Sequence, residues 1–400
     1  MKKTFAIVSM LVLLSACSPK SGDIQPTPTS DRGTFIPTIP TITIPASPTT
    51  LFDSERVTLE PNLTATVSSS TPAFSVTSFP GIALDGHGVD IEPIRTHKTI
   101  AVSPLELPSS AWTLYQTGDA WIKSLLSIAV EPSGVLWFGT IVSGIVRFDG
   151  ETWTRYTTED GLVDNAIRDL ILTPEGHLWV RTASGEVSFF DGETWTTYTT
   201  EDVFLENVLS MELAPDGTLW VATPNRGLLY FDGKTWRQAT MPDAWCPRVI
   251  YNIVIPSDGS LWLGGVDCVS HFEGDQWSFY MFHGWTYVSD MLVSPDGIPW
   301  FGHGDTVTGF ATLKEDELVY YHGAEGDARI GGVTALAIDR EGGIWMGGCC
   351  DDGIIYFDGE EAWTTLTPFD IVKVFDIATT DDGIVWITSD KGLIRYLPSE

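Results

Sequence analysis

A tryptophan that follows an apolar residue or a proline recurs seven times after residue 110. The seven are spaced by 42, 41, 42, 38, 45 and 41 positions: Trp137, Trp179, Trp220, Trp262, Trp300, Trp345 and Trp386. A second series alternates with the first: Trp112, Trp153, Trp195, Trp236, Trp277 and Trp363, with Tyr320 or Tyr321 near the one missing place. Seven copies of about 41 residues are typical of a β-propeller. We expect both series to fill the gaps between neighbouring sheets rather than to contact a ligand.

Each copy also has the pattern of a four-stranded sheet. In residues 208–240, stretches of alternating apolar and polar residues are separated by Asp216-Gly217 and Asp232-Gly233. Alternation bounded by Asp-Gly pairs predicts antiparallel hairpins, and Asp and Gly are the residues that such turns require. The sequence therefore predicts an all-β, seven-bladed propeller of four-stranded blades.

The two ends of the repeat region predict how the ring closes. The last copy stops after its third strand, at 392–396, whereas residues 111–115 read as a lone fourth strand at the start. We expect residues 111–115 to complete the last blade, which makes 111–400 one domain.

The first residues read as an export signal. Lys2 and Lys3 precede a ten-residue apolar run at 5–14, and Leu14-Ser15-Ala16-Cys17 resembles the bacterial lipobox. An ordinary signal peptide with a chance cysteine is the alternative. We expect residues 1–16 to be removed and Cys17 to carry the lipid. Two or more acyl chains on Cys17 would anchor the protein stably. The protein would then be extracytoplasmic and lipid-anchored, in the outer membrane if the cell has one.

Residues 17–110 contain Pro/Thr-rich stretches at 26–30, 36–40 and 44–50. Such stretches favour extended, unpacked chain, so we expect a tether here, with some order possible in 51–110.

The formal net charge is −31, and residues 111–400 hold 44 acidic and 15 basic residues. Such a surface repels phosphate backbones and excludes nucleic acid as a partner. It would suit a divalent cation, although we expect no cofactor. We expect a monomer.

The repeats resemble the two-component regulator propeller repeats. The resemblance is carried by 134–140 (Gly-Val-Leu-Trp-Phe-Gly-Thr), 217–223 (Gly-Thr-Leu-Trp-Val-Ala-Thr) and 190–198 (Phe-Asp-Gly-Glu-Thr-Trp-Thr-Thr-Tyr). It implies the propeller fold and an extracytoplasmic sensor role. We expect no kinase or membrane helix to follow the propeller, and therefore expect any signal to pass to another protein.

Candidate ligand contacts are the residues that break the repeat. Three tryptophans outside both series, together with Arg, Asn, His and Asp residues, fall in the predicted loops after the second and fourth strands, which share one face of a propeller. These residues are Trp121, Arg181, Asn225, Arg226, Trp245, Arg248, Trp285, His303, Asp305, Arg329, Asp351 and Asp352. The tryptophans could cap loops or stack on a ligand, and the arginines could grip a carboxylate or another anion.

Four cysteines lie in the predicted loops of the same face. An exported protein permits disulfides, and we expect Cys246 and Cys268 to bridge. Cys349 and Cys350 are adjacent, so a bridge between them would be strained, and their pairing stays open. A zinc site made of cysteines is the third possibility.

No Gly-x-Ser-x-Gly, His-Glu-x-x-His or phosphate-loop motif is present, so the sequence assigns no catalytic residue. We therefore expect a binding protein, not an enzyme, that recognises an unknown glycan, peptide or protein. One alternative is a metal-dependent lyase of the streptogramin-lyase propeller type, for which His283, His303 and His322 could supply a base or a metal ligand. The other is a non-catalytic scaffold.

Replacing Cys17 with Ser should abolish lipid attachment. In a bacterial host, the wild-type protein should incorporate an alkyne-labelled fatty acid and sediment with membranes, and the variant should do neither. The neighbouring Ser18→Ala variant should behave as the wild type. Continued labelling of the Cys17 variant would contradict the lipobox assignment.

Overall fold

The computed structural model describes residues 96–100, 103–104, 111–115 and most of 124–398. Within the last range it leaves out 199–204, 206, 243–245, 248, 275, 283–285, 305–308, 324–331, 349–352, 359–362, 367–368 and 370.

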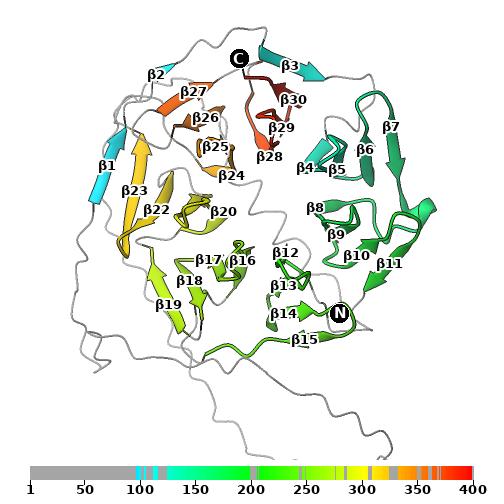
Figure 1. The fold of residues 1–400 in the computed structure, drawn as a ribbon, viewed down its shortest axis with the longest axis horizontal. Helices are drawn as coiled ribbons and strands as arrows, with labels where there is room; N and C mark the ends of the chain where they lie inside the picture. Colours follow the sequence, from blue (N-terminus) through cyan, green and yellow to red (C-terminus); the bar gives the residue numbers. More distant parts are fainter. Residues whose placement is uncertain are drawn as a thin grey trace, which may run out of the picture. The chain divides into compact units, whose positions relative to one another are not determined.

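Seven antiparallel sheets follow one another around a ring (Figure 1). Blade 1 contains β4 (Leu125–Val130), β5 (Leu136–Thr140), β6 (Ile145–Phe148) and β7 (Trp153–Tyr156). Blade 2 contains β8 (Ile167–Leu172), β9 (Leu178–Thr182), β10 (Val187–Phe190) and β11 (Trp195–Tyr198). Blade 3 contains β12 (Ser210–Leu213), β13 (Leu219–Thr223), β14 (Gly227–Phe231) and β15 (Trp236–Gln238). Blade 4 contains β16 (Ile250–Val254), β17 (Leu261–Gly265), β18 (Cys268–Glu273) and β19 (Gln276–Met281).

The remaining blades follow the same order. Blade 5 contains β20 (Val288–Val293), β21 (Pro299–His303), β22 (Phe310–Lys314) and β23 (Glu317–Gly323). Blade 6 contains β24 (Val333–Ile338), β25 (Ile344–Gly348), β26 (Ile354–Phe357) and β27 (Trp363–Leu366). Blade 7 contains β28 (Val374–Thr379), β29 (Val385–Ser389), β30 (Gly392–Tyr396) and β3 (Trp112–Tyr115). One 3-10 turn, η3 (Thr158–Asp160), links blades 1 and 2.

This arrangement confirms the predicted fold of seven four-stranded blades. The first strand of each blade is the innermost and faces the centre of the ring (Figure 1). Among the described residues, no helix is long and apolar enough to span a membrane.

The predicted closure of the ring is also confirmed. β3 pairs antiparallel with β30, with Trp112 opposite Tyr396 and Tyr115 opposite Leu393. The outermost strand of blade 7 therefore comes from the N-terminal side of the domain, and backbone hydrogen bonds join the two ends of the ring.

Two short strands come from the segment before the propeller, in which the sequence left order open. β1 (Thr96–Ile100) runs parallel to β23, with Thr96 opposite Val319. β2 (Ser103–Pro104) runs parallel to β27. These strands extend blades 5 and 6 to five strands and cover the outer edges that would otherwise be open to pairing with another chain.

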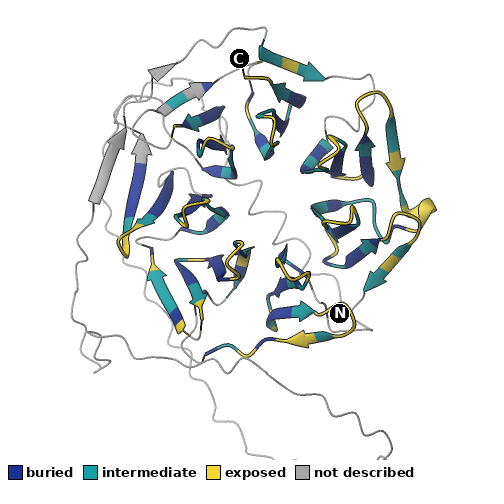
Figure 2. Cartoon of the chain, viewed as in Figure 1, coloured by how far each residue is buried: buried dark blue, intermediate teal, exposed yellow. Residues whose placement is uncertain are grey.

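The hydrophobic core is divided into seven clusters, one at each interface between neighbouring blades. Every blade contains buried residues (Figure 2). Six of the seven second-strand tryptophans are buried, and Trp220 is half-buried. Each packs with side chains of the following blade: Trp137 lies with Leu170 of blade 2, and Trp386 of blade 7 lies with Phe138 of blade 1. This placement confirms that the regular tryptophans fill the space between sheets.

A glycine in the second strand lets the next blade approach. A Cβ on Gly302 or Gly347 would overlap the side chain of Val333 or Val374, the first residue of the following innermost strand. Any larger residue at these glycines would push two sheets apart.

One detail of the second tryptophan series needs correction. In five blades a Phe on the third strand lies opposite the Trp of the fourth, as Phe148 lies opposite Trp153. In blade 5 the corresponding pair is Leu313 and Leu318. Leu318 therefore takes the missing Trp place, and Tyr321 matches Tyr156, three residues after Trp153.

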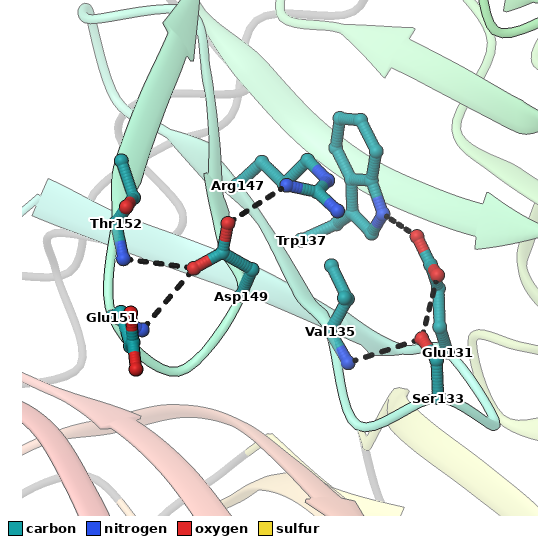
Figure 3. A network of polar contacts seen from close by, with 8 residues as sticks. All are labelled: Glu131, Ser133, Val135, Trp137, Arg147, Asp149, Glu151 and Thr152. Atoms are coloured by element: carbon teal, nitrogen blue, oxygen red, sulfur yellow. Dashed lines mark hydrogen bonds and ion pairs between the residues drawn. The ribbon is translucent and has the colours of Figure 1, made fainter.

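The Asp-Gly turns are held by the aspartate itself (Figure 3). Asp149 Oδ1 accepts hydrogen bonds from the backbone N–H groups of Glu151 (3.1 Å) and Thr152 (2.8 Å), and Gly150 has φ 97°. The same contacts recur at Asp191 and Asp232. These donors, Thr152 foremost, lower the pKa of Asp149. Turn geometry thus accounts for these Asp residues, as the sequence predicted.

Ring closure should depend on the packing of β3. Trp112 lies against Tyr396 (ring centroids 4.7 Å apart) and Trp345 (6.5 Å), so Trp112→Ala should lower the free energy of unfolding by roughly 2–4 kcal/mol. Thr113 is exposed on the same strand, and Thr113→Ala should change it by less than about 0.5 kcal/mol. Urea denaturation followed by tryptophan fluorescence checks both, and equal effects would contradict the role of β3 side chains in closure.

Candidate functional site

A solvent-open groove of about 510 Å³ lies at one end of blade 3. Two segments line it, the loop between β13 and β14 and the chain that leaves β15: Pro224, Asn225, Arg226, Gly227, Gln238, Ala239, Thr240 and Met241. A volume of this size suits a short peptide segment or a small saccharide.

Local hydrogen bonds fix the shape of the groove. The Arg226 N–H donates to the Thr223 hydroxyl (3.2 Å), which in turn donates to the Gly227 carbonyl (3.2 Å). Gln238 Nε2 donates to the Arg226 carbonyl (2.8 Å) and ties the two sides together. Gly227 has φ 68°, a conformation that disfavours most other residues.

The lining of the groove is more polar than apolar. Ala239 is buried, and Met241 packs on the cluster between blades 3 and 4. Asn225, Arg226 and Thr240 are exposed. These exposed side chains can offer hydrogen bonds and one positive charge to a ligand.

Blade 3 also contains three basic residues, balanced by three acidic ones in residues 210–238. Residues 226–237 contain Arg226, Lys234 and Arg237, three of the 15 basic residues in 111–400. Arg237 pairs with Asp232 (3.3 Å), on the turn away from the groove. Arg226 is the cation that lines the groove.

A second cluster of charge surrounds the centre of the ring. Three innermost strands place an aspartate directly after a β-bulge: Asp169 on β8, Asp290 on β20 and Asp376 on β28. Glu212 lies on β12. These residues were not among the predicted contacts, although the Asp recurs at the same place in three of the seven copies.

Two of these aspartates connect neighbouring blades. Asp376 Oδ2 accepts a hydrogen bond from the Ile128 N–H of blade 1 (2.9 Å), and Asp290 Oδ2 accepts one from the Leu336 N–H of blade 6 (2.6 Å). The Ser210 hydroxyl likewise accepts a hydrogen bond from the Ile253 N–H of blade 4 (3.2 Å). Asp169 instead faces the guanidinium of Arg181 at 3.8 Å.

Burial disfavours the charged form of these carboxyl groups. Burial, with a smaller contribution from the charge of Asp169, raises the pKa of Asp290 to about 7 and that of Glu212 to about 8. The pKa of Asp376 is also raised, by burial first and then by the neighbouring carboxylates. The hydrogen bonds from Leu336 and Ile128 act in the opposite direction.

Most of the predicted contacts cannot be placed. Asn225 and Arg226 lie together in the groove. The following lie outside the described residues: Cys17, Trp121, Trp245, Arg248, His283, Trp285, Asp305, Arg329, Cys349, Cys350, Asp351 and Asp352. His322 is described only as part of β23.

Three predicted loop residues lie in strands instead, and one of them, Cys268, is the first residue of β18. Arg181 belongs to β9, where the ion pair with Asp169 leaves 18% of its side chain exposed. His303 ends β21, is fully buried, and its Nδ1 lies 3.0 Å from the Thr286 hydroxyl. The prediction that Arg181 and His303 lie in loops was wrong, because the second strands of blades 2 and 5 extend far enough to include them.

In the part of the chain that the structure describes, no three His, Cys, Asp or Glu side chains are placed to hold a metal ion.

No family model and no curated protein matches the sequence. Solved structures do resemble the fold. The extracellular domain of the putative hybrid two component system BT3049 from B. thetaiotaomicron is 17% identical, with TM-score 0.58 over 68% of this chain and 40% of that one. Streptogramin B lyase is 14% identical, with TM-score 0.58 over 71% and 96%. YCF48 bound to D1 peptide is 17% identical, with TM-score 0.57 over 75% and 100%.

At these identities the likeness shows the fold. The chain spans about 40% of the length of the two-component-system structure that it matches.

The central carboxyl groups should make the protein more stable in mild acid. Between about pH 4.5 and pH 8 the folded state binds more protons than the unfolded state, because the folded pKa values are raised, so stability falls as pH rises. We expect the melting temperature to be several degrees higher at pH 5.5 than at pH 8.5.

The Asp290→Asn variant should flatten this profile. As a matched control, Glu193→Gln removes one carboxylate from the exposed turn between β10 and β11 and should leave the slope unchanged. Calorimetry at five pH values would decide, and a wild-type melting temperature that rises toward pH 8.5 would contradict the assignment.

Proposed function

We propose that the protein is a lipid-anchored, extracytoplasmic binding protein whose propeller recognises an anionic ligand in the blade 3 groove. The observation that carries this proposal is the groove itself, whose lining includes an exposed arginine, Arg226, and an exposed amide, Asn225. These are side chains with which proteins orient carboxylate groups of peptides and saccharides.

The negative charge of the domain limits how an anionic ligand could be bound. With 44 acidic and 15 basic residues after position 110, the domain repels most anions. A carboxylate would therefore have to be held by direct contact with Arg226, the basic side chain among the residues that line the groove. Long-range steering is weak here, so recognition depends on contact in the groove.

The compared structures support the location and the class of function. Several of them are extracellular domains of putative two-component or one-component systems, and one propeller is bound to a peptide. We propose by analogy that this propeller binds its ligand outside the cytoplasm and passes the signal to another protein. Cys17 would hold it at the membrane.

The alternatives gain less support. Streptogramin B lyase shares the fold, but His303 is buried in this chain and contacts a threonine. A scaffold without a small ligand would not need the groove. Neither alternative has an observation of its own in the described residues.

Replacing Arg226 with Ala should weaken anion binding. We expect a panel of acidic oligosaccharides and peptides with free carboxyl termini to contain members that raise the melting temperature of the wild type by about 5 °C at saturating concentration. In Arg226→Ala, the dissociation constant of those ligands should rise roughly 10- to 100-fold, the effect of losing one charge-assisted hydrogen bond.

Lys391 provides a matched control. It precedes the glycine of the same loop in blade 7, pairs with Asp390 at 3.1 Å and lies far from the groove around the ring. Lys391→Ala should bind like the wild type. Equal weakening in both variants would point to a general charge effect, and unchanged binding in Arg226→Ala would reject the groove.

A further inference from the structure

Two cysteines that are distant in the sequence lie together in blade 4. Cys246 belongs to the connection that enters the blade before β16, and Cys268 is the first residue of β18. Both are free thiols in this structure.

A glycine makes their approach possible. A Cβ on Gly265, the last residue of β17, would overlap the ring of Pro247 and the carbonyl of Val249. Because Gly265 has no side chain, the chain around Pro247 can rest on the end of β17. Cys246 is thereby held beside the short turn that leads from Gly265 to Cys268.

The two thiols differ in access. Cys246 is half-exposed, whereas Cys268 is 2% exposed. A reagent in solution can therefore reach the first and not the second.

They also interact directly. A hydrogen bond from Cys268 is the main cause that lowers the pKa of Cys246, and the same interaction, together with burial, raises the pKa of Cys268. The exposed thiol is thus the better nucleophile at neutral pH.

We infer that Cys246 and Cys268 form a disulfide in an ordered two-step exchange, in which Cys246 is the attacking residue and Cys268 the resolving one. The oxidant is an external disulfide, such as that of a thiol–disulfide oxidoreductase or a small-molecule disulfide. This pair is a modification site separate from the ligand groove, and it does not depend on the function proposed for that groove.

Each step of the exchange forms one S–S bond and breaks another. The Cys246 thiolate attacks one sulfur of the external disulfide, whose S–S bond breaks, and the released thiolate takes a proton from water. Cys268 then loses its proton to water and attacks Cys246 Sγ, which forms the internal bond and releases the second external thiol. Two cysteines are oxidised, and one disulfide is reduced to two thiols.

The bond would fix the connection between blades 3 and 4. This connection begins at Ala239 and Met241, which line the groove, and ends at the cysteine pair. Closing a loop of 22 residues restricts the unfolded chain, so the oxidised protein should melt roughly 5–10 °C higher than the reduced protein.

The test uses the full chain, reduced and then exposed to oxidised glutathione at neutral pH. Trypsin separates the four cysteines after Cys17 into three peptides, because Arg237, Arg248, Lys314, Arg340 and Lys373 bound 238–248, 249–314 and 341–373. Mass spectrometry without reduction should find 238–248 linked to 249–314. Finding both peptides with free thiols, or either one linked to 341–373, would overturn the pairing.

Two single variants test the order of attack. Cys268→Ser should accumulate one glutathionyl group on 238–248, whereas Cys246→Ser should leave 249–314 unmodified in the folded protein. Circular dichroism confirms that each variant is folded, and unfolding Cys246→Ser in urea should expose Cys268 to glutathionylation. Rapid modification of Cys268 in folded Cys246→Ser would overturn the proposed order.

Discussion

The ring depends on contact between sheets that share no hydrogen-bonded ladder. Each of the seven hydrophobic clusters takes its residues from two neighbouring blades, and the second-strand tryptophan lies at the junction in every case. No blade therefore has a core of its own: a single four-stranded sheet would expose both faces, and its stability comes from the blades on either side. The glycines at 302 and 347, which admit a valine from the next blade, are part of the same constraint because they set how closely two sheets can approach.

At the centre of the ring, polar contacts join neighbouring blades. There the first strands bring polar backbone groups together, and Asp290 and Asp376 satisfy N–H groups of the following blade. The arrangement adds hydrogen bonds to the apolar contacts between neighbouring sheets. It also gathers carboxyl groups whose pKa values are raised, first by burial and then by the charges of their neighbours. Packing of tryptophans between sheets and hydrogen bonding along the inner rim are thus two complementary ways of holding the blades in order.

The fold could be predicted because its signal is repeated. Trp spacing, Asp-Gly turns and the lone strand at 111–115 each predicted an element that the structure contains, and repetition removed the ambiguity of any single copy. The site could be predicted only in part, since it depends on departures from the repeat. Arg226 and Asn225 were identified because they lie in a predicted loop and depart from the repeat. Arg181 and His303 were wrongly assigned to loops, because the sequence does not define the end of a strand to better than one or two residues. The inner aspartates did recur at one place of the repeat. Their pairing with the next blade is a contact between residues up to about 250 positions apart, which no local pattern reveals.

The strand that closes the ring has a consequence for how the protein is made. Trp112 and its partner Tyr396 are separated by 284 positions, so at a synthesis rate of about 5–20 residues per second β3 exists for roughly 15–60 s before its partner does. During that interval six blades can form in order, each covering the previous one, while the exposed side of blade 1 and the unpaired β3 wait for blade 7. Any factor that accompanies the growing chain would find these two surfaces uncovered at the same time, and both disappear in one step when β30 arrives.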